Sequence, residues 1–264
     1  MTDLLPPPRF VAAGPGAAPR AIAVRSFAGA APSLVWLGGY RSDMRGTKAE
    51  RLSALAAREG LGFCRFDYSG HGESGGRFED GTISLWLEDA KAAIAAATDG
   101  PLILVGSSMG AWIALLLARE AAARGDGRLR GLLLLAPAPD FTRRLVEPAL
   151  SPAQRADLET QGFCTEPSAY SDAPNIYTRA LIEDGARNLL MTGPIDVPCP
   201  VHILQGTADP DVPAAHAIDL VACLPGEAVT LTLIPGGDHR LSREADLERI
   251  EAAALDLIGR TQNA

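Results

Sequence analysis

Basic residues, cysteines and long apolar runs are all scarce in this sequence, and each scarcity excludes a class of protein. The 24 lysines and arginines are outnumbered by 32 acidic residues, so the net charge is -8, which argues against a surface for nucleic acids or anionic membranes. No apolar run approaches the roughly 20 residues that a helix needs to cross a bilayer. We therefore expect neither a nucleic-acid partner nor a membrane span.

The four cysteines, Cys64, Cys164, Cys199 and Cys223, are scattered along the chain. They have neither the CxxC pairing of a zinc site nor the density of a disulfide scaffold. Cys64 lies in an apolar run and Cys223 near a predicted helix end, where buried thiols are common. This usage favours a reducing compartment. Because the first residues also lack the basic and apolar regions of a secretory signal, we expect a cytoplasmic location.

What the sequence does contain is a regular alternation of strand-like and helix-like segments. The 264 residues are 47% hydrophobic, which is enough for one large core. Strands are predicted at residues 20–26, 33–37, 61–66, 101–105, 130–136, 201–205 and 228–234. Helices are predicted at about 47–59, 82–98, 109–124 and 213–223, with a last one near 242–258.

The composition of the strands predicts a mostly parallel sheet. Residues 102–105 (Leu-Ile-Leu-Val) and 132–135 (four leucines) are apolar on both faces, as strands are when helices cover both sides of the sheet. The earliest strands carry more polar residues, and we expect them to be antiparallel edge strands. The predicted fold class is α/β, with a mostly parallel central sheet of about eight strands flanked by helices.

The alternation is interrupted once, between residues 139 and 200. This stretch is rich in proline and contains short helical patterns at 152–161 and 175–184. Sixty residues are too many for a simple connection between core strands, so we interpret them as a small helical lid over the carboxyl edge of the sheet. Ordinary surface helices are the alternative. The predicted division is a core of residues 1–138 and 201–264, with the lid at 139–200.

The sequence Gly106-Ser-Ser108-Met-Gly110 joins a predicted strand to a predicted helix. A serine in such a Gly-x-Ser-x-Gly turn is typical of a nucleophile elbow. The strained turn lifts the serine hydroxyl clear of the backbone, at the positive end of the following helix. Ser108 is therefore the predicted nucleophile.

A serine hydroxyl needs an adjacent base, and the four histidines can be separated by position. Ligands bind beyond the carboxyl ends of the strands in an open parallel sheet. His202 opens a strand at the opposite edge, His216 lies in a covering helix, and His71 belongs to a turn that its glycines and serines explain. His239 follows a strand at the correct edge and is the predicted base.

The base needs a carboxylate that fixes its tautomer. Asp209 and Asp211 both follow strand 201–205. Asp209 is nearer to the strand end and is the predicted acid, whereas Asp211 is placed to cap the next helix. Asp238, beside His239, would have to fold back on its neighbour.

The tetrahedral intermediate needs N–H donors for its oxyanion. The backbone N–H of Met109 is one predicted donor. The loop Gly38-Gly39-Tyr40 follows strand 33–37 at the same edge, so the N–H of Tyr40 is the second, with Gly39 beside the substrate. A tight turn without a catalytic role is the alternative for this loop.

The order Ser108, Asp209, His239 and the turn Asp67-Tyr-Ser-Gly-His-Gly-Glu-Ser74 resemble the α/β-hydrolase superfamily. The acid loop Gly206–Pro213 and the histidine loop Gly237-Asp-His239 are also similar to that superfamily, and the resemblance covers nearly the whole chain. It implies an α/β-hydrolase fold.

Four further segments resemble the subgroup that contains the mitochondrial acyl-protein thioesterase and acyl-glucuronide esterase. They are Gly38–Met44, Phe66–Gly72, Gly81–Trp86 and Leu181–Gly185. This resemblance implies a serine esterase or depalmitoylating thioesterase. The common His-Gly before the oxyanion residue is Gly38-Gly39 here, and no convincing mitochondrial leader precedes the domain, so we do not transfer that location.

These observations predict hydrolysis of carboxylic esters or acyl thioesters through an acyl-enzyme, without a metal or organic cofactor. The expected partner is a small-molecule or acyl-group substrate, and the sequence does not distinguish a monomer from a dimer. Phe141, Phe163 and Tyr177 are predicted to contact substrate from the lid. The lid arginines could bind an anionic leaving group or form a solvated face. The alternatives are a carbon–carbon bond (diketone) hydrolase and a non-catalytic ligand-binding receptor.

Overall fold

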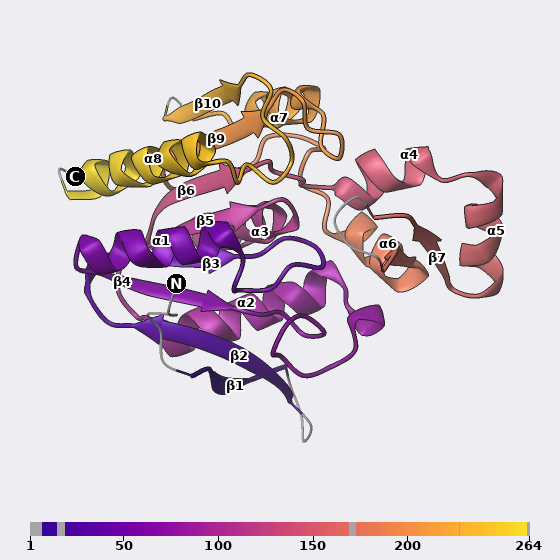
Figure 1. Cartoon of the computed structure of the whole chain (residues 1–264), viewed down its shortest axis with the longest axis horizontal. Helices are drawn as coiled ribbons and strands as arrows, with labels where there is room; N and C mark the ends of the chain where they lie inside the picture. The colour runs from indigo at the N-terminus through magenta and orange to yellow at the C-terminus, as the bar shows by residue number, and fades with distance from the viewer. Residues whose placement is uncertain (1–6, 15–18, 169–172, 227, 263–264) are drawn as a thin grey trace.

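An eight-stranded sheet forms the centre of the structure, a computed structural model that describes residues 7–14, 19–168, 173–226 and 228–262. The strand order is β1-β2-β4-β3-β5-β6-β9-β10 (Figure 1). The strands are β1 (Arg9–Ala13), β2 (Arg20–Phe27), β3 (Ala30–Leu37), β4 (Leu61–Phe66), β5 (Leu102–Ser107), β6 (Leu129–Leu135), β9 (Val201–Gly206) and β10 (Val229–Ile234).

The six strands from β4 to β10 in this order are parallel, and β2 is antiparallel to both of its neighbours. The prediction of early antiparallel edge strands is therefore only partly right. β2 is antiparallel, but β1, which was not predicted, occupies the edge beside it. β3 is parallel and lies inside the sheet, because residues 34–37 are apolar and are buried between β4 and β5.

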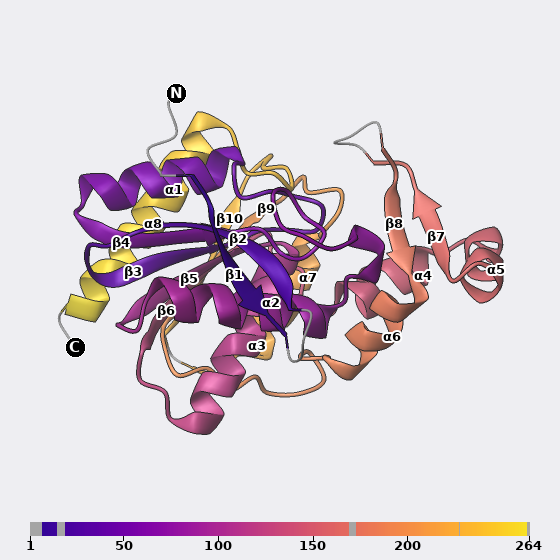
Figure 2. The same cartoon turned by 90° about the horizontal axis from the view of Figure 1, so that it is seen from below.

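Helices cover both faces of the sheet (Figure 2). One face packs against α1 (Thr47–Arg58) and α8 (Glu244–Gln262), and the other against α2 (Ile83–Ala97), α3 (Met109–Arg124) and α7 (Ala214–Ala222). Each face has its own buried apolar cluster. The predicted α/β class, with a mostly parallel sheet of about eight strands, is confirmed.

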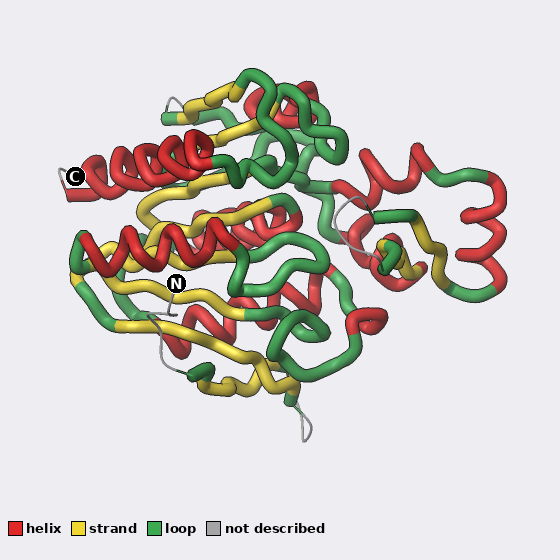
Figure 3. The backbone as a smooth tube through the Cα atoms, in the orientation of Figure 1, coloured by secondary structure: helices red, strands yellow, loops and turns green. Residues whose placement is uncertain are grey.

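Of residues 139–200, the last run back to the start of β9, where the Pro200 carbonyl accepts the N–H of Leu132, and most of the other described ones lie beyond the end of the sheet to which the parallel strands point (Figures 1 and 3). Their elements are a π-helical turn (Thr142–Val146) that continues into α4 (Glu147–Ala149), then α5 (Pro152–Thr160), β7 (Phe163–Glu166), β8 (Asn175–Thr178) and α6 (Arg179–Arg187). The helix predicted at 175–184 is wrong in its first part. Residues 175–178 form a strand that pairs with β7, because Ile176, Tyr177 and Thr178 favour extended backbone.

Hydrogen bonds tie the two ends of this segment to each other and its second end to the core. Near its start, the buried carboxylate of Asp140 accepts the N–H groups of Leu190, at 2.8 Å, and Met191, at 2.7 Å. Near its end, the carbonyl of Asn188 accepts the indole N–H of Trp112 on α3 at 3.1 Å. The two ends of the segment are therefore held together, and the second of them is held against α3.

Two sequence predictions concern membranes and thiols. In the described part of the chain, no helix combines the length and apolarity that a bilayer crossing requires. All four cysteines are free; Cys64 and Cys164 are buried, whereas Cys199 and Cys223 are partly exposed. The burial predicted for Cys64 is confirmed, and that predicted for Cys223 is incomplete because the residue caps the end of α7.

Candidate active site

Ser108 stands between β5 and α3 with φ 54° and ψ -117°, a conformation that non-glycine residues rarely adopt. The two flanking glycines make this turn possible. A Cβ atom at Gly106 would lie 2.6 Å from the carbonyl oxygen of Gly110, and one at Gly110 would lie 2.1 Å from that of Leu37. The turn predicted from the sequence is therefore present and presents a partly exposed serine at the carboxyl edge of the sheet.

His239 connects Ser108 to Asp209. Its Nε2 lies 3.1 Å from Ser108 Oγ, and its Nδ1 lies 2.8 Å from Asp209 Oδ2. The Asp209 side chain is fully buried, and that of His239 is 17% exposed. The structure thus brings together the three side chains that the sequence predicted at this edge.

The Asp209 carboxylate is held in the ionised state by its neighbours. Burial alone would raise its pKa, but hydrogen bonds from His239 and from the N–H groups of Asp211 and Val212, both at 2.9 Å, keep the pKa below the usual aspartate value. Gln205 donates its side-chain amide to Asp209 Oδ2 at 3.1 Å. An ionised Asp209 favours the tautomer in which His239 Nδ1 carries the proton and Nε2 faces the serine.

The two alternative acids occupy other environments. Asp211 is exposed, and the N-cap residue of α7 is Pro213, two positions after Asp211. Asp238 Oδ1 accepts the N–H of Leu241 at 2.9 Å and closes its own turn. Ligand atoms of Asp209, Asp211 and His239 lie within 4.8 Å of one another, the spacing of a possible metal site. Two of these three groups, Asp209 and His239, already contact each other directly.

The other histidines have partners away from Ser108. His202 Nε2 lies 2.9 Å from Thr232 Oγ1, and His216 Nε2 lies 2.9 Å from the carbonyl oxygen of Pro139. His71 is buried in the turn after β4, 3.2 Å from the carbonyl oxygen of Ser69. These three positions agree with the sequence-based exclusion of His71, His202 and His216 as the catalytic base.

The predicted oxyanion donors lie on two adjacent segments. Met109 is the first residue of α3, where backbone N–H groups have no partner within the helix, and it is buried beside Ser108. The loop after β3 passes close by, because a Cβ on Gly39 would lie 3.4 Å from Ser108 Cβ. Tyr40 and Met109 both line the cavity that contains Ser108.

This cavity has a volume of about 380 Å³ and lies between the sheet edge and residues 139–200. From the core it is lined by Tyr40, Ser108, Met109, Ala138, Pro210, Asp211, Val212 and His239, and from the 139–200 segment by Phe141, Leu145, Val146, Ala149, Leu150, Gln154, Glu166, Pro167, Asn175 and Tyr177. The rings of Tyr40 and Tyr177, which both line it, stack on each other with their centroids 5.8 Å apart. Burial raises the pKa of both tyrosines, so both hydroxyls stay protonated.

Two of the predicted substrate contacts do not line the cavity. Phe141 and Tyr177 do, but Phe163 is 41% exposed on β7 and lies outside. Side chains alternate along a strand, so the cavity-lining Glu166 and the buried Cys164 share one face, which leaves Phe163 on the other. Gly39 stands next to Ser108 without lining the cavity.

The arginines of residues 139–200 are engaged elsewhere. Arg143 pairs with Glu147, Arg144 with Asp219 and Arg187 with Asp184, while Arg155 and Arg179 donate to backbone carbonyls. Among the described residues that line the cavity, none is lysine or arginine, whereas Glu166 and Asp211 carry carboxylates. Residues 169–172, outside the described ranges, contain no basic residue either. The interpretation of these arginines as a solvated face is therefore favoured.

Gln205 and Glu166 are site residues that the sequence patterns do not indicate. Gln205 is buried near the end of β9 and ties Asp209 to the carbonyl of Val212. Its one signal in the sequence is a polar residue near the end of an otherwise apolar strand. Glu166 has no such signal, because its place at the cavity depends on the β7–β8 pairing.

Comparison with known proteins agrees with this arrangement. The model of the alpha/beta hydrolase family matches residues 8–253. The mouse and human proteins named palmitoyl-protein thioesterase ABHD10, mitochondrial, are both 31% identical to the chain, over 90% of its length and 78% and 76% of theirs. A crystal structure titled as a putative hydrolase from Agrobacterium vitis S4 superposes with a TM-score of 0.93 at 52% identity, over 96% of this chain and 99% of that one. The structure of mouse alpha/beta hydrolase domain-containing protein 10 superposes with a TM-score of 0.83 at 29% identity, over 95% and 98%.

These comparisons correct the expected location. A cytoplasmic location is contradicted, because the curated relatives are named as mitochondrial proteins. The expectation rested partly on the cysteine usage, which does not distinguish the cytoplasm from other reducing compartments. The resemblance to the acyl-protein thioesterase subgroup, in contrast, is confirmed.

Proposed function

The chain belongs to the alpha/beta hydrolase family, and on that premise we propose that it hydrolyses acyl thioesters and carboxylic esters with Ser108, His239 and Asp209 as a catalytic triad. The observation that carries the proposal is the pair of contacts that His239 makes, at 3.1 Å to the serine hydroxyl and 2.8 Å to the buried carboxylate. The name of the curated relatives as palmitoyl-protein thioesterases supports the acyl thioester as the substrate class.

In the acylation half, Ser108 Oγ attacks the carbonyl carbon of the substrate while His239 Nε2 takes the hydroxyl proton. The negative charge moves to the carbonyl oxygen, which accepts hydrogen bonds from the N–H groups of Met109 and Tyr40. When the tetrahedral intermediate collapses, the bond from carbon to the leaving sulfur or oxygen breaks. His239 returns its proton to the leaving group, and the acyl group stays on Ser108.

In the deacylation half, His239 Nε2 takes a proton from water, and the resulting hydroxide equivalent attacks the acyl-serine carbonyl. The carbon–Oγ bond breaks, Ser108 recovers the proton from His239, and the carboxylic acid leaves. The ionised Asp209 stabilises the imidazolium in both halves, because its oxygen accepts the Nδ1 proton.

Residues 139–200 are proposed to act as a lid that forms the acyl-binding wall. More than half of the residues that line the cavity come from this segment, and Phe141, Leu145 and Leu150 are apolar. An acyl chain that covers these side chains loses water contact, which favours binding in proportion to the area buried. The division into a core of 1–138 and 201–264 and a lid of 139–200 is proposed on this basis.

The leaving group is proposed to be neutral or positively charged. The described cavity lining contains the carboxylates of Glu166 and Asp211 and no basic side chain. An anionic leaving group would therefore meet repulsion in the free enzyme, at a strength that solvent and salt reduce. The lining supports a thiol of a neutral or basic molecule over a carboxylate-bearing sugar.

The direct test is a panel of acyl esters and thioesters of graded chain length, with an acyl glucuronide and a diketone included. We expect kcat/KM to be highest for thioesters with apolar acyl chains. For the acyl glucuronide it should be at least tenfold lower than for these thioesters. Cleavage of the diketone alone would support a carbon–carbon hydrolase instead, and binding of all compounds without turnover would support a receptor.

A further inference from the structure

We propose that His71 is a positioning residue that holds the oxyanion loop, residues 38–41, in its active conformation. His71 lies on the turn after β4, away from the proposed triad, and it is 4% exposed. Its Nε2 accepts the backbone N–H of Arg41 at 3.2 Å. This inference rests on the proposed function, since the loop supplies the Tyr40 N–H to the oxyanion.

The Arg41 backbone needs such a partner because its φ is 56°. A non-glycine residue in this left-handed region is strained, by about 1 kcal/mol or more, and relaxes unless a contact fixes it. The contact to His71 holds the chain one residue after Tyr40. Loss of that contact frees the peptide group between Tyr40 and Arg41 and lets the Tyr40 backbone shift about the preceding peptide group, whose Gly39 carbonyl is held by the N–H and the hydroxyl of Ser42.

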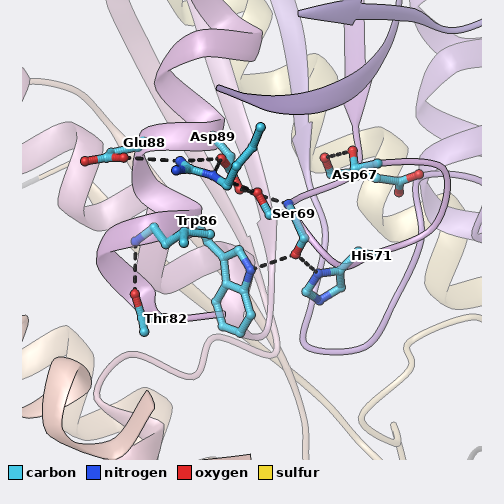
Figure 4. Close-up of polar contacts among 10 residues, drawn as sticks. Asp67, Ser69, His71, Thr82, Trp86, Glu88 and Asp89 are labelled. Carbon is cyan, nitrogen blue, oxygen red and sulfur yellow. Dashed lines mark hydrogen bonds and ion pairs between the residues drawn. The ribbon is translucent and has the colours of Figure 1, made fainter. Parts of the chain in front are cut away.

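His71 can accept this hydrogen bond because its ring is neutral and its tautomer is set. The carbonyl oxygen of Ser69 lies 3.2 Å from His71 Nδ1, so Nδ1 carries the proton and Nε2 keeps its lone pair. The same carbonyl accepts the indole N–H of Trp86 at 3.1 Å (Figure 4). Burial lowers the pKa of His71 to about 4, so the acceptor is present at neutral pH.

A buried polar network keeps Ser69 in place. The carboxylate of Asp89 accepts the Ser69 N–H at 2.8 Å and its hydroxyl at 2.6 Å (Figure 4). Arg20 pairs with Asp89 from β2 at 2.9 Å. A chain of contacts therefore runs from β2 through the turn to the loop that contains Tyr40.

Two further sets of contacts join this turn to the loop or to the residues that follow it. Asp67 Oδ1 accepts the N–H of Met44 at 2.7 Å. The rings of Tyr40 and His71 also pack against the same two aromatic side chains, Phe78 at 5.0 and 5.1 Å and Trp86 at 5.9 and 5.3 Å. The turn thus packs against the loop, and His71 accepts the N–H of the residue next to Tyr40.

The test compares His71→Phe, which keeps the ring but removes the acceptor, with His71→Gln, whose amide oxygen can accept the Arg41 N–H. Removing one oxyanion donor costs about 10²- to 10³-fold in kcat, and a misplaced donor loses part of this. We expect His71→Phe to lower kcat about 10- to 100-fold with KM within about twofold, and His71→Gln to recover most of the loss.

A second readout separates positioning from general damage. A trifluoromethyl ketone forms a charged tetrahedral adduct with serine, whereas the matching methyl ketone binds largely as the ground state. In His71→Phe the affinity for the first compound should fall as much as kcat/KM, and the affinity for the second should not change. Ser74→Ala is the control, because Ser74 stabilises the turn through Asp67 and Ala23 without contacting the loop.

Several outcomes would overturn the inference. One is a His71→Phe enzyme with kcat and ketone affinities within twofold of wild type. Another is an equal loss in His71→Phe and His71→Gln, or a loss in Ser74→Ala of the same kind and size. Should His71→Phe fail to fold, His71→Leu replaces it in the same comparison. Because Ser108→Ala tests the triad separately, an inactive Ser108→Ala beside an unaffected His71→Phe leaves the proposed function standing while the inference falls.

Discussion

His239 Nε2 and Ser108 Oγ lie 3.1 Å apart although 131 positions separate the two residues in the chain. Two parallel strands produce this contact. Ser108 follows β5 and His239 follows β10, and both strands run to the same edge of the sheet. Asp209 follows β9, which lies between β5 and β10 in the sheet, and it contacts the imidazole on the side opposite Ser108.

The first prediction separates the two acids of the loop after β9. Asp209→Asn should lower kcat by about 10⁴-fold, because the amide favours the wrong histidine tautomer. Asp211→Asn should lower it less than fivefold, since Asp211 is exposed, whereas the fully buried Asp209 carboxylate lies 2.8 Å from His239 Nδ1. Steady-state kinetics on one acyl thioester measure both, and equal losses in the two variants would refute the assignment of Asp209.

The second prediction concerns the packing that permits the elbow. Gly110→Ala should lower the free energy of unfolding by about 2 to 3 kcal/mol, because its Cβ would lie 2.1 Å from a backbone oxygen of β3. Gly193→Ala is the matched control, as a Cβ there meets nothing within 4 Å. Urea unfolding measures both, and similar midpoints for the two variants would contradict the predicted close approach.

The third prediction concerns the charge of the leaving group. S-octanoyl thiocholine and S-octanoyl 3-mercaptopropionate share an acyl chain but carry opposite charges. Glu166→Gln should lower the ratio of kcat/KM for the thiocholine ester to that for the mercaptopropionate ester about three- to tenfold at low salt. The reason is that it removes a carboxylate from the cavity. Comparing ratios between enzymes cancels the intrinsic reactivity of each thioester.

The matched control for that prediction is Glu183→Gln, which removes an exposed carboxylate from α6 that does not line the cavity. Its ratio should equal that of the wild type. If Glu166→Gln and Glu183→Gln behave alike, the proposed preference for neutral or cationic leaving groups is wrong.

The fourth prediction follows from the burial that lowers the pKa of His71 to about 4. An ordinary histidine has a pKa of about 6.5, so between these two values the unfolded chain binds a proton at residue 71 that the folded protein does not. The free energy of unfolding is therefore unaffected by this group above about pH 6.5. It falls as the pH drops towards 4, by up to about 1.4 kcal/mol per pH unit.

Urea unfolding at pH 7 and pH 5 measures this effect, with His71→Gln as the variant that lacks the titrating group. The wild type should lose about 2 kcal/mol more than the variant between the two pH values. An equal loss in both proteins would show that His71 does not resist protonation.

The sequence was sufficient for the strand ends that form the site, for a physical reason. Apolar strands such as 102–105 identify parallel core strands, and the carboxyl ends of such strands share one edge, so Ser108, Asp209 and His239 could be placed together without coordinates. The elbow adds a local signal, because Gly106 and Gly110 are positions where a side chain would collide with backbone.

The parts that the sequence did not predict depend on which strands pair and on which side of a strand each side chain lies. Residues 175–178 were expected to be helical, but their partner across β7 makes them a strand. That pairing also turns Phe163 outward and Glu166 towards the cavity. The role of His71 is equally hidden, since its turn is explained locally by glycines and its contact to Arg41 spans 30 positions.

The central claim is that Ser108 is activated by His239, and labelling with a fluorophosphonate tests it most directly. The reagent phosphonylates only an activated serine, and mass spectrometry of the digested protein identifies the residue. The account predicts a single modified serine, Ser108, in the wild type and a loss of labelling by several orders of magnitude in His239→Ala, with Ser107 unmodified in both. Labelling that persists at the same rate in His239→Ala, or that falls on another serine, would contradict it.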